Sequence, residues 1–156
     1  MHIPVQNLYS ALIIVQFLVV TLHDWLNIPG WTHGRQVQAA VGSRKKFALV
    51  TLANSIFPGL AIAFILLYRQ SPKPVFVTDY WLIYCAVTVV SAVMMWYVPY
   101  FFGTDEKTRR DYAAMYEGTI QVLPARGDNP RPNLLHLCFH LLFLVTLSLA
   151  AVLRFS

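Results

Sequence analysis

The chain contains 156 residues, of which 57% are hydrophobic and 12% are charged, and its formal net charge is +5. Soluble domains carry about 25% charged residues, so this composition excludes a soluble enzyme, a disordered chain and a small secreted disulfide-bonded protein. It predicts an integral membrane protein that forms a single domain over residues 1–156.

Four long apolar runs predict membrane-spanning helices. The runs contain 19, 22, 23 and 20 residues. As helices they extend about 28 to 34 Å, which is enough to cross a hydrocarbon core about 30 Å thick. Each helix also satisfies its own backbone hydrogen bonds, as lipid requires. The sequence therefore predicts an all-α, four-helix transmembrane bundle with spans at residues 8–26, 47–68, 80–102 and 134–153.

The distribution of positive charge predicts the orientation of the chain. Nine Lys and Arg residues lie in residues 27–46 and 103–133, and only three lie on the opposite side of the membrane. Because cytoplasmic loops carry the excess of Lys and Arg, we expect the first and third loops in the cytoplasm and both termini outside. The basic charge then reflects attraction to anionic lipid. Nucleic-acid binding is not expected, because the chain offers no soluble domain with a basic face.

In the first loop, residues 27–46, the sequence predicts a turn at Pro29-Gly30 and a short helix that ends near Gly42. The loop closes with the basic cluster Arg44-Lys45-Lys46. This cluster is either a simple positive-inside anchor or a recognition site for an anionic lipid headgroup.

The third loop, residues 103–133, predicts a helix lying in the membrane interface. Thr104 is the expected N-cap, with Asp105 and Glu106 in the first turn, where the helix dipole favours negative charge. Gly118 is the expected end. The apolar face of this helix is predicted to carry Tyr112, Met115, Tyr116 and Ile120.

A proline-rich turn follows this helix and leads into the last span. Residues 123–133 contain three prolines and one glycine, a composition typical of a shaped turn. Within it, Arg126 and Arg131 are candidates to hold an anionic headgroup. The Arg126-Gly127-Asp128 tripeptide matches an integrin ligand by chance, because this loop is expected in the cytoplasm.

Polar groups from different spans are predicted to meet at one depth. The first span ends in His23-Asp24, and the fourth begins on the same side with His136 and His140. Residues i and i+4 share a helix face, so the last two point the same way. Asn54 of the second span reaches the same level. Ionisable groups at such depth face the bundle interior and indicate function by default.

Three interpretations of this cluster remain open. It is an interhelical hydrogen-bond network that fixes helix register, or a ligand, proton or substrate site in which a histidine titrates near neutral pH. The third is a metal or haem site, with four candidate ligands: His136, His140, His23 and Asp24.

These features favour a non-catalytic binding or accessory membrane protein, including a subunit of a larger membrane complex. One alternative is an enzyme that acts on a lipid or quinone-like substrate, with histidine as acid, base or metal ligand. Another is a small transporter or channel assembled from several copies. The catalytic candidates are His23, Asp24, His136 and His140, and the cofactor-binding candidates are His136, His140 and Asn54.

The second span also carries a stripe of small residues, Ser55, Gly59 and Ala63. Small residues let helices approach closely, so this face is expected to pack within the bundle or to mediate self-association.

Overall fold

The computed structural model of the chain describes residues 5–71 and 73–156. It is built around four long helices, each long and apolar enough to cross a membrane, at Val5–Trp25, Arg44–Leu67, Val75–Phe102 and Leu134–Phe155. The four predicted spans are confirmed as helices, with boundaries that differ by up to five residues because residues outside the predicted runs extend the helices.

The first and third long helices contain changes of helical type. The first consists of α1 (Val5–Leu22) and a 3₁₀ turn, η1 (His23–Trp25). The second is α3 (Arg44–Leu67). The third consists of α4 (Val75–Ala92), a π-helical turn, η2 (Val93–Tyr97), and α5 (Val98–Phe102). The fourth is α7 (Leu134–Phe155).

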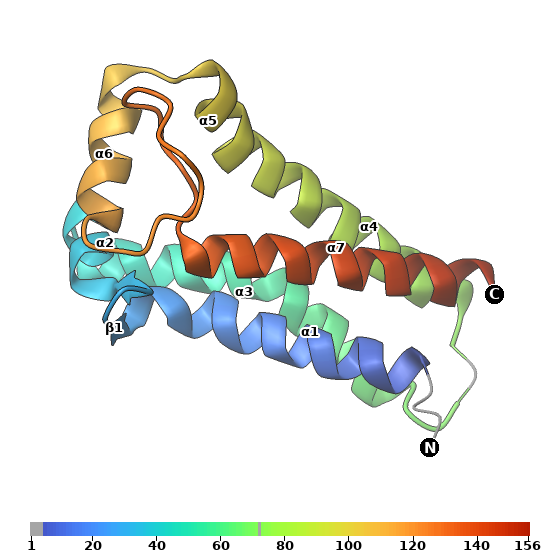
Figure 1. The fold of residues 1–156 in the computed structure, drawn as a ribbon. Helices are drawn as coiled ribbons and strands as arrows, with labels where there is room; N and C mark the ends of the chain where they lie inside the picture. The colour runs from blue at the N-terminus through green and yellow to red at the C-terminus, as the bar shows by residue number, and fades with distance from the viewer. Residues whose placement is uncertain (1–4, 72) are drawn as a thin grey trace.

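The bundle is closed at one end and open at the other. α1 packs against α3 and α7, and α7 packs against α4 (Figure 1). Aromatic contacts join α3 and α4 near the connecting residues 68–74, where the ring of Phe64 lies 5.9 Å from Phe76 and 5.1 Å from Tyr80. Toward α5, α4 tilts away from the other three helices (Figure 1).

Polar side chains of α1 face the core. Tyr9 and Gln16 are fully buried. The Gln16 amide donates to the Thr146 hydroxyl at 2.5 Å, and the Tyr84 hydroxyl lies 3.5 Å from the Gln16 amide oxygen. These bonds satisfy a polar side chain that would otherwise be costly inside an apolar bundle.

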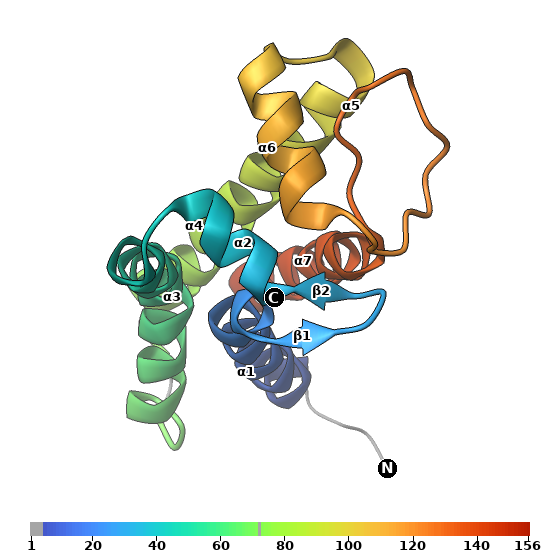
Figure 2. The same ribbon diagram turned by 90° about the vertical axis from the view of Figure 1, so that its left-hand side faces the viewer.

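A cap of short elements covers the open end of the bundle. It comprises β1 (Asn27–Ile28), β2 (Thr32–His33), α2 (Gly34–Val41), α6 (Glu106–Tyr116) and residues 117–133 (Figure 2). The strands pair antiparallel in the register Asn27↔His33. The predicted Pro29-Gly30 turn joins them, and Gly30 adopts φ +77°, which favours glycine. The strands themselves are too short to be predicted from the sequence.

Hydrogen bonds tie the two halves of the cap together. The Ile120 amide donates to the Gly30 carbonyl at 2.7 Å, and the Leu134 amide donates to the Ile120 carbonyl at 2.8 Å. The Asn133 side chain donates to the Trp31 carbonyl at 3.3 Å. The first and third loops therefore form one structural unit.

Two predictions for the third loop are wrong in detail. The N-cap of α6 is Asp105 instead of Thr104, because the Asp105 carboxylate accepts the Thr108 amide at 2.9 Å. Ile120 lies beyond the helix, which ends at Tyr116. The chain turns at Gly118, whose φ of +75° is incompatible with continued helix.

The small-residue stripe of α3 is used within the chain. The Ser55 hydroxyl lies 2.9 Å from the Thr21 hydroxyl, and a Cβ at Gly59 would lie 3.7 Å from the Phe17 ring. α1 and α3 therefore approach closely along this face.

Candidate functional site

A cavity of about 610 Å³ lies between α1, α3, α4–η2 and α7. We call it the chamber. Most of its wall is apolar, with residues such as Phe57, Val87, Phe139 and Phe143. Its polar lining includes four of the residues singled out from the sequence: His23, Asn54, His136 and His140.

The chamber opens sideways between α3 and α4. Three large side chains that line it, Phe57 of α3 and Val87 and Met95 of α4–η2, are 59%, 58% and 59% exposed on the lateral surface of the bundle. The opening follows from the tilt of α4 away from α3, and it gives the chamber an apolar rim.

His136 is held in one tautomer by Asn133, the N-cap of α7. The Asn133 amide oxygen accepts the His136 backbone N–H at 3.0 Å and lies 2.8 Å from its ring Nδ1. A backbone N–H only donates, so this atom is the amide oxygen, and Nδ1 must carry the proton that it accepts. In the neutral ring, Nε2 is therefore an unprotonated acceptor. It has no hydrogen-bond partner within residues 5–71 and 73–156.

His140 lies one helical turn further along α7, with its ring centroid 6.3 Å from that of His136. Its Nδ1 lies 3.1 Å from the Tyr97 hydroxyl. The preceding residue, Trp96, lies against His136 at 4.2 Å between ring centroids. Both aromatic residues belong to the π-helical turn, a feature often found at functional sites.

His23 and Asp24 form a side-chain pair, and both ring nitrogens of His23 have a partner. His23 Nδ1 donates to the Val19 carbonyl at 2.8 Å, and Nε2 lies 3.1 Å from the Asp24 carboxylate. The His23 ring, but not Asp24, lines the chamber. Its edge-on contacts to His136 and Phe139 have centroid distances of 5.8 and 5.4 Å.

This geometry does not support the metal or haem hypothesis. In the part of the chain that the structure describes, no group of three or more His, Cys, Asp or Glu residues is arranged to hold a metal ion. The physical reason is that most of the histidine nitrogens already interact within the protein. Both ring nitrogens of His23 have partners, and so does Nδ1 of His136 and of His140. Three or four ligands are usual for a zinc site.

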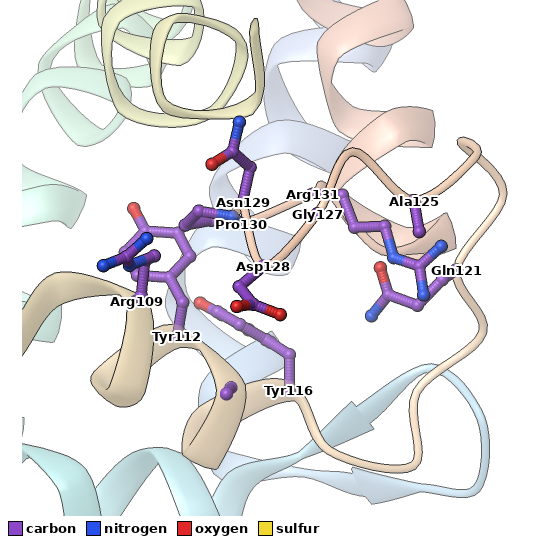
Figure 3. Close-up of a pocket in the computed structure, with 11 residues that line it drawn as sticks. Arg109, Tyr112, Tyr116, Gln121, Ala125, Gly127, Asp128, Asn129, Pro130 and Arg131 are labelled. Atoms are coloured by element: carbon purple, nitrogen blue, oxygen red, sulfur yellow. The ribbon is translucent and has the colours of Figure 1, made fainter. Parts of the chain in front are cut away.

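A second cavity of about 300 Å³ lies in the cap (Figure 3). We call it the cap pocket. Tyr112 and Tyr116 of α6 separate it from the chamber, because their rings pack on Trp96 at 4.9 and 5.1 Å. Burial raises the pKa of both tyrosine hydroxyls above the ordinary value, and the charge of Asp24 adds to the effect at Tyr116. Both are therefore neutral hydroxyls at physiological pH.

The basic residues singled out from the sequence lie at three separate places. Arg44, Lys45 and Lys46 are exposed in the first turn of α3. Arg126 lies over the rings of Tyr100 and Phe101, at 5.7 and 5.2 Å, whereas Arg131 lines the cap pocket.

Sequence reasoning missed Arg109, which joins Arg131 in the cap pocket. A signal for it exists in the spacing of charges along α6. Lys107 and Arg110 each have an acidic partner four residues away, whereas Asp105, four residues before Arg109, is the N-cap.

The chamber and the cap pocket differ in the chemistry that they offer. The chamber suits a mostly apolar molecule that carries a hydrogen-bonding group, and the cap pocket suits a small polar one. A scan against models of protein families, a search of curated proteins and a search of solved structures find no match to this chain.

Proposed function

We propose that the protein binds a membrane-soluble amphiphile in the chamber, with the polar end of the ligand at His136 and His140. The observation that carries this proposal is a cavity of about 610 Å³ with an apolar rim and two histidines in its wall. Ligand sites of about 300 to 1,000 Å³, lined by apolar side chains and a few placed polar groups, are typical of small-molecule binding.

The hydrogen bonds around His136 define what the polar end of the ligand must be. Because Asn133 holds the proton on Nδ1, Nε2 presents a lone pair and requires a donor. A ligand hydroxyl meets this requirement, whereas a ligand with only ether or carbonyl oxygens does not. The proposed ligand is therefore a lipid or quinol-like molecule with an O–H at its polar end.

The surroundings of the chamber support entry from the membrane. Its rim residues lie on the lateral surface of helices that are apolar and long enough to span a bilayer. We place the cap in the cytoplasm, where the nine Lys and Arg residues of residues 27–46 and 103–133 meet the anionic leaflet, and we place α6 at the membrane surface.

Binding of decyl hydroquinone to the protein in dodecyl maltoside tests the proposal. Ala53 lines the chamber, whereas its neighbour Leu52 does not and is 61% exposed. Ala53→Phe fills the chamber and should abolish binding, and Leu52→Phe adds a ring outside it and should leave binding unchanged. The dimethyl ether of the same probe lacks the O–H and should bind about tenfold more weakly, as expected for one lost hydrogen bond.

Two results would contradict this function. Equal binding by the two phenylalanine variants would place the probe in the detergent or on the surface. Equal binding of the hydroquinone and its dimethyl ether would show that His136 does not accept a hydrogen bond from the ligand.

A second candidate function, catalysis on the same amphiphile, is favoured by the fixed tautomer of His136, since a general base needs an unprotonated nitrogen facing its substrate. The variant His136→Gln distinguishes the two functions by the molecules that co-purify with it. Mass spectrometry of molecules co-purified with the wild-type and variant proteins should show one molecule at lower occupancy for a binding protein. It should show two different masses, product and substrate, for an enzyme.

A further inference from the structure

Among the residues that the structure describes, two guanidinium groups of the cap pocket have no carboxylate partner. Figure 3 shows Arg109 of α6 on one side of the pocket and Arg131 of the following loop on the other, with Asp128 between them in this view. Among the described residues, the Arg109 side chain has no hydrogen-bond or ion-pair partner, and Arg131 donates only to the Leu123 carbonyl, at 2.9 Å. Lys107 and Arg110 on the same helix are both paired.

Gln121 adds a buried hydrogen-bond acceptor to the pocket lining. The Thr119 hydroxyl uses its single proton on the Tyr116 carbonyl, at 2.7 Å, so its oxygen accepts from the Gln121 side chain at 3.0 Å. This fixes the Gln121 amide nitrogen toward Thr119. The other amide atom, Oε1, is then a buried oxygen with no partner in the described part of the chain. Such groups are rare in proteins and usually have a partner that the protein alone does not supply.

The pocket therefore offers two kinds of interaction in about 300 Å³. Arg109 and Arg131 are donors whose planar geometry matches phosphate oxygens. Gln121 Oε1 and the Asp128 carboxylate are acceptors, and Asp128 has no ion-pair partner within 4.0 Å among the described residues. A ligand that satisfies both kinds carries a phosphate that reaches a guanidinium group and an N–H or O–H donor that reaches an acceptor.

We propose that the cap pocket binds a phosphate ester with such a donor, of the ethanolamine phosphate type, either as a free molecule or as the headgroup of a phospholipid. This site is separate from the chamber, since Trp96, Tyr112 and Tyr116 lie between them. Its failure would leave the proposed function of the chamber untouched.

Isothermal titration calorimetry of the protein in dodecyl maltoside tests the proposal with three probes: inorganic phosphate, ethanolamine phosphate and dihexanoyl phosphatidylethanolamine. Arg109→Gln should weaken binding of ethanolamine phosphate about tenfold, the loss expected for a hydrogen bond to a charged group. Arg110→Gln is the matched control. It removes the same charge from the next residue, which is paired with Glu106 on the exposed side of α6, and it should change the affinity less than twofold.

Gln121→Leu tests the other end of the ligand. Wild-type protein should bind ethanolamine phosphate at least fivefold more tightly than inorganic phosphate, and the variant should bind the two equally. Arg131 is unsuitable as the main test because it also holds the Leu123 carbonyl, so its loss changes the loop as well as the charge.

The comparison of probes distinguishes the two sources of the ligand. A short-chain lipid that binds more tightly than ethanolamine phosphate supports a headgroup site, and equal affinities support a site for the free ester. The proposal is overturned if none of the three probes binds, if Arg109→Gln and Arg110→Gln have equal effects, or if inorganic phosphate binds as tightly as both esters.

Discussion

Asn133 joins three parts of the protein through one side chain. It caps α7, fixes the proton of His136 on Nδ1, and donates to the Trp31 carbonyl of the β1–β2 connection, while only 1% of it is exposed. The chemistry of the chamber and the attachment of the cap therefore depend on the same residue.

Asn133→Ala should lower the free energy of unfolding by about 2 to 3 kcal/mol, since it removes a helix cap and leaves two buried groups without a partner. A sodium dodecyl sulfate titration measures this loss. Nitrogen-15 NMR of the histidines should show His136 change from the Nδ1-protonated form to a mixture of tautomers. Asn7→Ala, at an exposed position in α1, is the control and should change stability by less than about 0.5 kcal/mol.

Gly34 lies at a close approach of backbones in the cap. A Cβ at this position would lie 2.5 Å from the Asp24 carbonyl oxygen and 2.9 Å from that of Leu26. Backbone atoms cannot move away at low cost, so Gly34→Ala should destabilise the protein by about 1 to 3 kcal/mol. Gly59→Ala, whose Cβ would meet only the Phe17 ring at 3.7 Å, should be neutral or stabilising. Thermal unfolding of both variants measures this.

At the scale of single elements, the N-terminus of α6 should respond to acid. The Thr108 hydroxyl and amide donate to Asp105 and lower the pKa of its carboxyl below the ordinary value. The native state therefore releases this proton more readily than the unfolded state does. The stabilisation is present above about pH 4, the ordinary value for Asp, and is lost as the pH falls through the lower native pKa.

Solution NMR of the Thr108 amide between pH 6 and pH 2 checks this expectation. The amide signal should move as Asp105 is protonated, with a midpoint below about 3.9. Asp105→Asn keeps an N-cap but does not titrate, so its Thr108 signal should stay constant across the same range. A wild-type midpoint above about 3.9 would contradict the hydrogen-bonded cap.

The elements also show what a sequence pattern can predict. The four spans are visible because lipid demands about 20 consecutive apolar residues, and the convergence of His23, Asn54, His136 and His140 follows from the alternating direction of the spans. The π-helical turn that brings Trp96 and Tyr97 toward α7 has no such signature, since it is a local change of helical repeat inside a uniformly apolar run.

The cap pocket escapes prediction for a different reason. It depends on the path of residues 117–133, where hydrogen bonds such as that of Ile120 to Gly30 set the course of the chain. Composition marks this segment as a turn, but only the tertiary structure shows that Arg131 lines the same pocket as Arg109 and that Arg126 lies elsewhere, over Tyr100 and Phe101.

At the scale of the whole molecule, the closed and open ends should lie on opposite sides of the membrane. The excess of Lys and Arg in the cap predicts that it is cytoplasmic. A cysteine-free variant, Cys85→Ala with Cys138→Ser, allows this to be tested in intact cells with a membrane-impermeant maleimide. Ser71→Cys, between α3 and α4, should be labelled, and Ser43→Cys, at the start of α3, should be labelled only after the cells are opened. The reverse pattern would invert the orientation.

The bond between Gln16 and Thr146 joins residues 130 positions apart in the chain. During synthesis the first helix therefore enters the membrane long before its hydrogen-bonding partner has been made. Until α7 leaves the ribosome, the Gln16 amide needs a temporary partner, such as water, an insertion factor or another helix, because hydrocarbon provides none. The Trp31 carbonyl is likewise synthesised before its hydrogen-bond donor, Asn133, which follows 102 residues later in the chain. Assembly of both the core and the cap therefore depends on the segment that contains Asn133 and α7.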